Sequence, residues 1–267
     1  MSFAIARVGM GDLPLDPQTV ADLVSNGQTS AAGHLEIDAS GTIRFTAERQ
    51  QLHDDIVRNF TVKIPKTNDR IVFMLGGGPA AGKSTMLKSK SLNVPAPGVE
   101  AVEVNPDLVK ERLHEYQTRV DAGDVDAARY VHEESSYLAK RIHKAALERG
   151  QAVVHDGVGV SYERVVKQAK AMGYVVKGYY AFVDPDLAVA RAVARGKKTG
   201  RFVPETYIRE RHRKVSQIFE DAARVLENIE LYDTTDEAVL VARGSGGKLE
   251  VVDAERYARF LAIGRAT

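Results

Sequence analysis

A glycine-rich segment near residue 80 constrains the fold of this chain more than any other part of its sequence. It fits the pattern G-x-x-x-x-G-K-[ST] without a mismatch, and it consists of Gly77, Gly78, Pro79, Ala80, Ala81, Gly82, Lys83 and Ser84, followed by Thr85. The apolar run Ile71–Leu75 before it predicts a buried parallel strand, and residues 84–88 after it predict the opening of a helix. Because a strand, a glycine loop and a helix in this order aim backbone N–H groups at an anion, the sequence predicts a phosphate-binding loop (P-loop).

The residue types of this loop indicate its ligand. Gly77 and Gly82 permit backbone angles and close approaches that a Cβ would prevent. Lys83 would place a positive charge near the β- and γ-phosphates of a nucleotide, and the Ser84 hydroxyl would bind Mg²⁺. The alternative is a chance glycine-rich turn, but the strand before it and the helix after it favour nucleotide binding. We therefore expect ATP and Mg²⁺ as cofactors.

Composition narrows the class of protein. The chain has 267 residues, of which 44% are hydrophobic, enough for one large α/β domain or one domain with extensions. With 37 Lys and Arg against 36 Asp and Glu, the net charge argues against a membrane-surface protein or a binder of long nucleic acid. The absence of cysteine excludes disulfides and thiolate metal sites. No apolar run approaches the ~20 residues that span a bilayer, and no signal peptide is apparent, so a cytoplasmic enzyme is expected.

The predicted elements indicate two parts. Residues 1–68 are expected to form an extension that packs on the core, because they contain little apolar material for a domain of their own. Within it we predict helices over Asp16–Ser25 and Thr46–Phe60 and a small hairpin over Gly33–Phe45. Residues 69–267 would form the P-loop domain.

In the P-loop domain, strands alternate with helices. After Ile71–Leu75, strands are predicted at Ala101–Val104, Ala152–His155, Val175–Val183 and Ile229–Tyr232. Helices are predicted at about Asp107–His114, Asp126–Arg149, Tyr162–Met172, Pro185–Arg195 and Pro204–Asn228. This alternation predicts an α/β fold with a parallel sheet covered by helices on both faces. A hairpin around residues 239–252 and a helix at about Ala254–Ile263 would close the chain.

The ends of the strands supply the candidate acids, since ligands of such sheets bind beyond the carboxyl ends of the strands. Asp107 follows the second strand in Asn105-Pro106-Asp107, where its carboxylate could accept a proton from an attacking hydroxyl. Asn-Pro-Asp is equally a good turn and helix N-cap, and the local sequence does not decide between the two. Asp156 ends the third strand in the Walker B manner, which favours Mg²⁺ coordination over a turn role. His155 before it is interpreted as a packed strand residue.

A basic segment at about 191–214 is the candidate for a flap that closes over phosphates. Glycines at 196 and 200 interrupt its cations, which are Arg191, Arg195, Lys197, Lys198, Arg201, Arg209, Arg211, Arg213 and Lys214. The alternative is a solvated helix face with salt bridges. Because phosphoryl transfer needs cations on the developing charge, we assign Arg195 and Arg201, which flank the turn, to phosphate.

Two further polar segments have more than one possible role. His132–Tyr137 combines hydroxyls with acids, which suits recognition of a sugar or base and equally suits an exposed helix turn. Asp233–Asp236 follows the fifth strand and is interpreted as a loop rather than as an adenine contact. We assign acceptor binding to Asn105, Asp107, Glu134 and Asp156.

Together these residues resemble the zeta toxin family. The order and spacing of that family are matched by five segments, namely the P-loop, Val104–Lys110 with Asp107, His132–Ser135, Asp156–Gly157, and Arg195 with Gly200–Glu205. The segment Thr46–Phe60 also resembles the helix that often precedes the P-loop there. The resemblance covers roughly Phe45–Asp236, and this ordered set is more specific than the P-loop alone.

The resemblance implies an activity. Zeta toxins are P-loop kinases that use ATP and Mg²⁺ to phosphorylate the 3′-hydroxyl of the amino sugar of UDP-N-acetylglucosamine, and a small helical antitoxin blocks their nucleotide site. By this resemblance Lys83 binds phosphate, Asp107 is the general base, and Arg195 and Arg201 stabilise the transferring group. Ser84 and Asp156 would lie around the metal.

The chain departs from the family at two places. After the third strand the family often has Gly-Thr-Gly and in some members an arginine, where this chain has Gly157, Val158, Gly159 and Val160. These positions would contact the acceptor more than ATP, so the sugar nucleotide is the weakest part of the resemblance. Where some members carry an aspartate two residues before the base, this chain has Asn105.

Three functions follow from the sequence. The first is a kinase that phosphorylates UDP-N-acetylglucosamine and acts as the toxin of a toxin–antitoxin pair. The second keeps the chemistry but uses another nucleotide or nucleotide-sugar acceptor. The third, of a different class, is a nucleotide-binding module that regulates a partner and transfers nothing.

Overall fold

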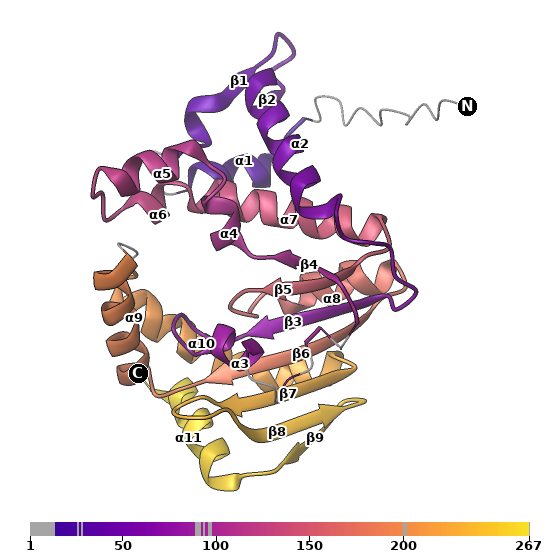
Figure 1. The fold of residues 1–267 in the computed structure, drawn as a ribbon, viewed down its shortest axis with the longest axis vertical. Coiled ribbons are helices and arrows are strands. Elements are labelled where there is room, and N and C mark those ends of the chain that lie inside the picture. Colours follow the sequence, from indigo (N-terminus) through magenta and orange to yellow (C-terminus); the bar gives the residue numbers. More distant parts are fainter. Residues whose placement is uncertain are drawn as a thin grey trace.

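The computed structural model describes residues 14–25, 27, 29–88, 92, 94–95, 98–199 and 202–266. Its centre is a seven-stranded sheet in the order β4-β5-β3-β6-β7-β8-β9 (Figure 1). The first five of these pair in parallel, whereas β8 pairs antiparallel with β7 and β9 pairs antiparallel with β8. Their bounds are β3 (Ile71–Gly76), β4 (Ala101–Val104), β5 (Ala152–Asp156), β6 (Val175–Phe182), β7 (Asn228–Asp233), β8 (Val239–Ser245) and β9 (Lys248–Val251). The α/β fold with a mostly parallel sheet flanked by helices is thus confirmed.

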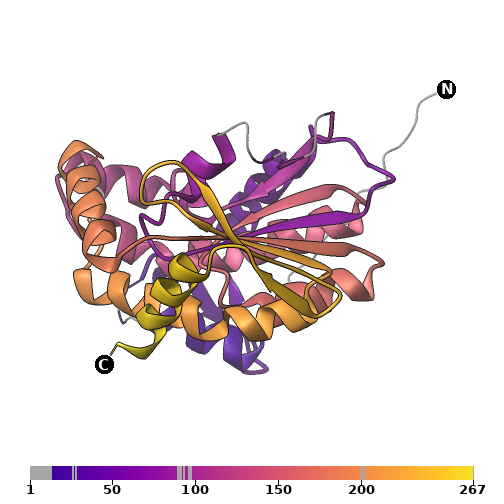
Figure 2. The ribbon, with the colours of Figure 1, turned by 90° about the horizontal axis from the view of Figure 1, so that it is seen from below.

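Helices cover the two faces of the sheet unequally (Figures 1 and 2). The helices of the P-loop part are α3 (Lys83–Lys88), α4 (Pro106–Lys110), α5 (His114–Asp121), α6 (Ala127–Tyr130), α7 (His132–Glu148), α8 (Tyr162–Ala171), α9 (Pro185–Thr199), α10 (Glu205–Val225) and α11 (Ala254–Arg265). One face packs against α7, α8, α10 and α11, and the opposite face packs against α3 and the chain near Leu92 and Val94.

The two faces of β3 show how the sequence produces these layers. Val72 and Met74 belong to the core beneath α7, α8 and α10, whereas Phe73 and Leu75 belong to the core beneath α3. All four side chains are at most 2% exposed. Because successive side chains of a strand point to opposite faces, a strand buried on both sides must be apolar at every position. The uninterrupted apolar run of β3 meets this requirement, and the strand that leads into the P-loop lies inside the sheet between β5 and β6.

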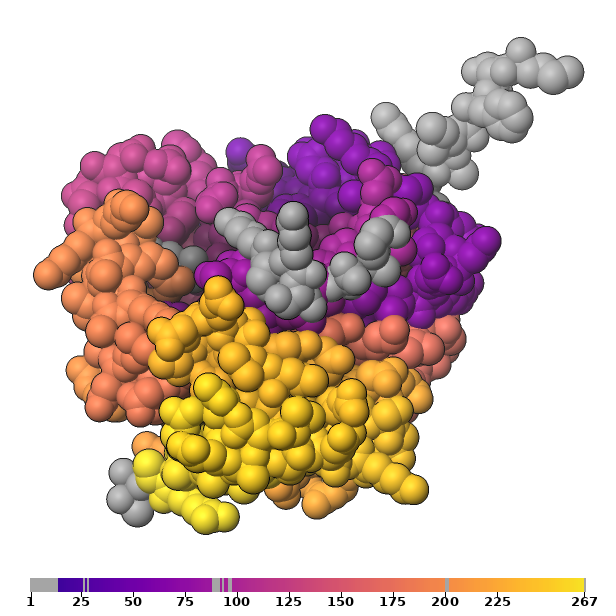
Figure 3. All heavy atoms as spheres, turned by 60° about the horizontal axis from the view of Figure 1, so that its bottom comes forward, coloured from indigo at the N-terminus to yellow at the C-terminus, as the bar shows by residue number. Residues whose placement is uncertain are grey.

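The C-terminal segment completes one edge of the sheet. The predicted hairpin forms from β8 and β9, and β8 pairs antiparallel with β7. Helix α11 follows and packs on α10, and Phe260 joins Phe182 and Phe219 in an aromatic cluster. This segment forms the lower part of the molecular surface in Figure 3, in yellow. Within the described part of the chain, no helix has the length and apolar character needed to cross a bilayer.

Some predicted helices differ from the observed ones. The helix expected over Asp126–Arg149 is two helices, because the chain breaks at Val131, whose backbone angles are not helical. The helix expected over Asp107–His114 is likewise interrupted, and α5 begins at His114. Helix α9 continues four residues past the expected end. Periodicity alone does not locate such breaks, since both pieces keep a buried face.

The N-terminal elements pack on α7. They are α1 (Pro17–Val24), the 3₁₀ turn Ala32–His34, β1 (Leu35–Ile37), β2 (Ile43–Phe45) and α2 (Ala47–Thr61) (Figure 1). The helix, hairpin and helix occur in the predicted order, and the 3₁₀ turn was not predicted. Leu23, Ala31 and Phe45 form a small core of their own, against which Tyr137 of α7 packs. Helix α2 adds Ile56 and Val57 to the main core. The division of the chain into an extension over 1–68 and a core over 69–267 stays a prediction.

A buried ionic cluster ties these elements to α7. The Glu134 carboxylate is fully buried and accepts hydrogen bonds from Arg49 Nε at 2.6 Å, Arg49 Nη2 at 2.7 Å and the Ser30 hydroxyl. His53 Nε2 lies 2.6 Å from Oε1 and donates, since an ionised carboxylate only accepts. Burial alone would raise the pKa of Glu134, but the hydrogen bonds from His53 and Arg49 outweigh it and hold the pKa at about 2. Glu134 is therefore ionised and serves as a structural anchor.

We expect Glu134→Gln to lower the free energy of unfolding by about 3 kcal/mol, because it leaves the nearly buried Arg49 guanidinium without its main counter-charge. Urea denaturation followed by circular dichroism measures the loss. Glu148→Gln, at an exposed pair on the same helix, should change stability by less than about 0.5 kcal/mol. Equal effects of the two substitutions would contradict the structural role of Glu134.

A second internal pair consists of His143, which is fully buried, and His155, which is partly exposed. The rings of His143 in α7 and His155 in β5 meet edge to face with centroids 5.1 Å apart, so His155 is a packed strand residue, as expected. No described residue hydrogen-bonds to either ring nitrogen of His143. Desolvation lowers the pKa of His143 to about 4 and that of His155 to about 3. The charge of His143 adds to the shift of the pKa at His155, and the positive charge of Arg164 has a smaller effect on both rings. Both rings are neutral in the folded protein at neutral pH.

This pair predicts a loss of stability in mild acid. Below about pH 6.5 the unfolded chain protonates both histidines while the folded chain does not, so unfolding takes up protons and stability falls as pH falls towards 4. The melting temperature should therefore fall between pH 7 and pH 5, and less steeply in His143→Leu. The exposed His114 on α5 is the control, and His114→Leu should keep the slope of the wild type. Parallel slopes for all three proteins would contradict the assignment.

Candidate active site

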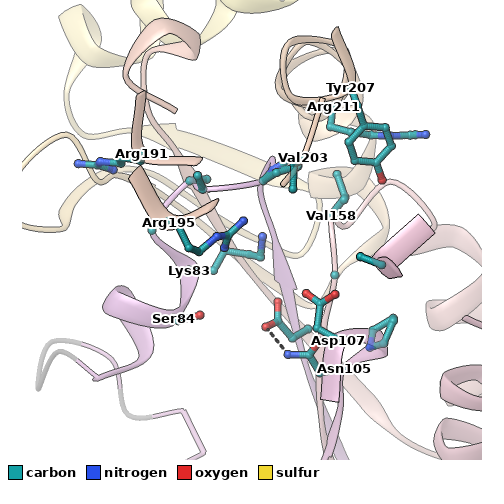
Figure 4. Close-up of a pocket in the computed structure, with 18 of the residues that line it drawn as sticks. Lys83, Ser84, Asn105, Asp107, Val158, Arg191, Arg195, Val203, Tyr207 and Arg211 are labelled. Atoms are coloured by element: carbon teal, nitrogen blue, oxygen red, sulfur yellow. Dashed lines mark hydrogen bonds between the residues drawn. The ribbon is translucent and has the colours of Figure 1, made fainter. Parts of the chain in front are cut away.

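A large cavity opens at the carboxyl ends of the parallel strands, with a volume of about 1670 Å³. Its walls come from the P-loop, from α4 and the α6–α7 region, from the chain after β5 and β7, and from α9 and α10. Figure 4 shows Lys83, Arg195 and Asp107 reaching into this cavity from different walls. The volume exceeds the ~300–1,000 Å³ that is typical of a pocket for one small ligand, so the cavity has room for two.

The P-loop connects β3 to α3 through a tightly curved backbone. Gly82 has a φ of 83° and Ala80 a φ of 58°, both in the left-handed region. Gly77 N–H donates to the Val158 carbonyl at 2.9 Å, which joins the loop to the chain after β5. Lys83 Nζ donates to the carbonyls of Gly77 at 2.9 Å and Gly78 at 3.3 Å, so the ammonium group lies over the loop where phosphates would bind.

Two residues that the sequence did not single out support this loop from behind. His212 of α10 is 3% exposed, and its Nε2 lies 3.0 Å from the Pro79 carbonyl, to which it donates. The Thr234 hydroxyl, at the end of β7, donates to the Ala81 carbonyl. Gly78 must lack a side chain, since a Cβ there would lie 2.1 Å from the His212 ring. Only the tertiary structure brings these residues to the loop, 133 and 153 positions away in the chain.

Asn105 and Asp107 have separate tasks at the end of β4. The Asn105 side chain caps α4 by accepting from the Asp107 N–H at 2.9 Å. Its amide nitrogen also donates to Asp156 Oδ2 at 3.1 Å. Because Asn105 is the N-cap, the Asp107 carboxylate does not cap the helix and points into the cavity (Figure 4). The sequence did not decide between a capping and a catalytic role for Asp107, and in the structure the N-cap of α4 is Asn105.

The residues present fit a magnesium ion that is shared with a nucleotide. Ser84 at the start of α3 and Asp156 at the end of β5 line the same cavity and offer oxygen ligands. Mg²⁺ commonly takes one or two carboxylates and completes its shell with phosphate oxygens and water. No cluster of three or more His, Asp or Glu side chains that could hold a metal ion occurs among the described residues. The two residues remain a prediction as metal ligands.

The basic segment contributes cations to one wall. Arg191 and Arg195 of α9 and Arg211 of α10 line the cavity. Arg191 Nη2 donates to the carbonyls of Thr234 at 3.0 Å and Thr235 at 2.7 Å, which fixes the α9 side of the wall to the end of β7. Arg209 instead pairs with Asp186 and Glu205 on the surface. Arg201, which we assigned to phosphate, lies outside the described residues.

Glu134 does not line the cavity, in contrast to our expectation of acceptor contact. Its carboxylate is buried against Arg49, His53 and Ser30. The cavity is lined instead by the two preceding residues, His132 and Glu133. The sequence cannot distinguish Glu133 from Glu134, because adjacent helical residues differ only in the face that a remote segment covers. The remaining expected residues, Asn105, Asp107 and Asp156, all line the cavity together with Val158.

Comparison with known proteins agrees with this geometry. The family model of the zeta toxins matches residues 56–245. No curated protein matches the chain. Among solved structures, a chain of the AvrRxo1-ORF1:AvrRxo1-ORF2 complex has a TM-score of 0.63 at 20% identity, covering 81% of this chain and 73% of that one. A chain of the PezAT toxin–antitoxin system of Streptococcus pneumoniae has a TM-score of 0.59 at 16% identity, covering 83% and 95%.

At these identities the solved structures show the fold, and the family model covers most of the chain. A P-loop at the centre of a parallel sheet, opening into a cavity with an acid and several cations, defines a phosphotransferase of the P-loop kinase class. The chain belongs to the zeta toxin family.

Gly78→Ala should weaken ATP binding at least tenfold, because the new Cβ would force apart the loop and the His212 ring. The loss should be smaller in a His212→Ala background, where the ring is absent. Isothermal titration calorimetry of the two single variants and the double variant measures the coupling. Gly33→Ala is the matched control, since a Cβ there meets nothing within 4 Å. A full loss of affinity that persists unchanged in the double variant would contradict the proposed contact.

Proposed function

We propose that the protein transfers the γ-phosphate of ATP to a hydroxyl of a sugar nucleotide, and that the acceptor is the 3′-hydroxyl of the amino sugar of UDP-N-acetylglucosamine. This proposal is carried by the observation that the Asp107 carboxylate faces the same cavity as the P-loop, while Asn105 caps the helix. A nucleotide-binding module has no need for an acid at this place. A kinase needs one to accept the proton of its acceptor.

Each residue of the cavity has a task in this reaction. The P-loop backbone and Lys83 hold the phosphates, and Asp107 accepts the proton of the acceptor hydroxyl as its oxygen bonds to the γ-phosphorus. The bond between that phosphorus and the β–γ bridging oxygen breaks, and ADP leaves with the electron pair. Arg195 and Arg201 offset the negative charge on the transferring group. Mg²⁺, held by Ser84 and Asp156, would neutralise phosphate charge when bound.

The acceptor is the least constrained part of the proposal. The volume of about 1670 Å³ supports a second ligand as large as a nucleotide sugar. Asn105, Asp156 and Glu133 supply polar groups for it, and Glu133 takes the place that we expected for Glu134. Val158, however, presents an aliphatic wall where family members often have a hydroxyl. A different nucleotide or nucleotide sugar is therefore the second candidate, and a screen of acceptors separates the two.

We also propose a protein partner. A neighbour in fold belongs to a toxin–antitoxin system, and another was solved in a complex of two proteins, in one case with ATP. A small helical antitoxin that covers the nucleotide cavity would keep this kinase inactive. Because ATP and sugar nucleotides are cytoplasmic metabolites, we place its action in the cytoplasm.

The test is transfer of labelled phosphate from ATP to UDP-N-acetylglucosamine. Asp107→Asn should lower kcat by a factor of about 10² or more and leave ATP binding nearly unchanged, whereas Lys83→Ala should weaken ATP binding as well. Asp121→Asn, on the exposed side of α5, is the control and should behave as the wild type. ATP binding without transfer to any nucleotide acceptor, and without an effect of Asp107→Asn, would identify a regulatory module instead.

A further inference from the structure

A lysine one helical turn beyond Asp107 is buried beside the cavity. Lys110 ends α4, and its Nζ lies 3.1 Å from Asp107 Oδ1. The Lys110 side chain is 9% exposed, whereas that of Asp107 is 37% exposed. Most other ion pairs between neighbouring turns lie on the surface, as between Arg58 and Asp55, whose side chains are 58% and 46% exposed. The pair on α4 thus combines a confined cation with an acid that opens to the cavity.

We propose that Lys110 is a positioning residue, which keeps the Asp107 carboxylate ionised and directed at the acceptor hydroxyl. The inference rests on the proposed role of Asp107 as general base. Acceptance of a proton by Asp107 does not by itself require a cation at this position. The assignment follows from the ion pair, the burial of the lysine stem, and the place of both groups on one short helix.

Burial of the lysine makes this pair more effective than a surface pair. An exposed lysine samples many rotamers and is screened by water, so that a surface ion pair contributes little. The stem of Lys110 is held by its surroundings, and its ammonium group therefore stays near one carboxylate oxygen. A positive charge within about 4 Å favours the charged form of a carboxylate. Ionised Asp107 can accept a proton, whereas the protonated acid cannot.

Other charged groups of the described chain also lie around the pair. His132 and Glu133 face it from the start of α7, and Arg211 faces it from α10. Partial desolvation and the positive charge of Lys110 lower the pKa of His132, although the residue is exposed. His132 is therefore neutral at neutral pH. Arg211 instead stacks on the Tyr207 ring at 4.7 Å. Among these described residues, Lys110 contacts Asp107 directly.

A direct role in substrate binding is the competing explanation, because Lys110 also lines the cavity. An ammonium group that binds a phosphate of the acceptor would lower the KM of the acceptor and leave the pH dependence of the chemistry unchanged. A positioning residue would instead change the pH dependence of the chemistry and leave the KM of the acceptor unchanged. The pH profile and the KM values therefore distinguish the two roles.

The experiment compares Lys110→Met, which keeps the stem without the charge, with Lys110→Arg, which keeps the charge. We expect Lys110→Met to lower kcat at pH 7 about tenfold and to move the acidic limb of kcat/KM to higher pH by about one unit. The KM for ATP should stay the same, and in Lys110→Arg the acidic limb of kcat/KM should lie at the same pH as in the wild type. Lys144→Met removes a lysine of the exposed pair with Glu148 on α7, and it should leave both readouts unchanged.

The outcomes separate this inference from the proposed function. An acidic limb that coincides in Lys110→Met and the wild type, or a change confined to the KM of the acceptor, overturns the role of Lys110 alone. Absence of transfer by the wild type, or full activity of Asp107→Asn, overturns the proposed function and this inference with it. Thermal melting verifies that each variant is folded. If Lys110→Met does not fold, the pH profile and KM values of Lys110→Gln are measured instead, and the same outcomes decide.

Discussion

The parallel ladder of β4, β5 and β3 is the constraint on which the rest of the site depends. Its register places Val104 beside His155 and Leu75 beside Asp156. Asn105 therefore emerges next to Asp156, and Asp156 emerges just before the P-loop begins. Because parallel strands end at one edge of the sheet, three segments separated by many residues present their polar groups to one cavity. Since side chains alternate between faces, a slip of one residue in β4 would turn Asn105 away from Asp156 and break their hydrogen bond.

Charges in this protein are used in two different ways. At Glu134 the carboxylate is closed off from water and both of its oxygens accept hydrogen bonds, so it holds the N-terminal elements to α7. Asp107 pairs with Lys110 and lines the cavity, with its side chain 37% exposed. Removing one partner from a closed cluster leaves a buried charge, which affects folding. An acid at an open edge is free to exchange protons with a ligand, which suits it to chemistry. The two glutamates of α7 illustrate the contrast, since Glu133 lines the cavity and Glu134 does not.

Much of the fold was predictable because it depends on short-range patterns. The apolar run of β3, the alternation of strands and helices, and the spacing of the P-loop glycines all follow from neighbours in sequence. The interruption near Val131 was not predictable, since the helical pattern continues through it. In the site, Lys83, Asn105, Asp107 and Asp156 lie where strand ends predict them. His212 and Thr234 had no local signal, because their task is to contact a loop more than a hundred residues away.

The sequence by itself determined that a P-loop motif follows a buried apolar strand and that acids follow the adjacent strands. These properties follow from residue types within a few positions of one another, where steric freedom and apolar pattern act locally. The tertiary structure decided which acid opens to the cavity, which one is locked against Arg49, and which residues brace the P-loop. Burial and hydrogen bonding depend on distant segments that cover a side chain, and a linear pattern does not specify those partners.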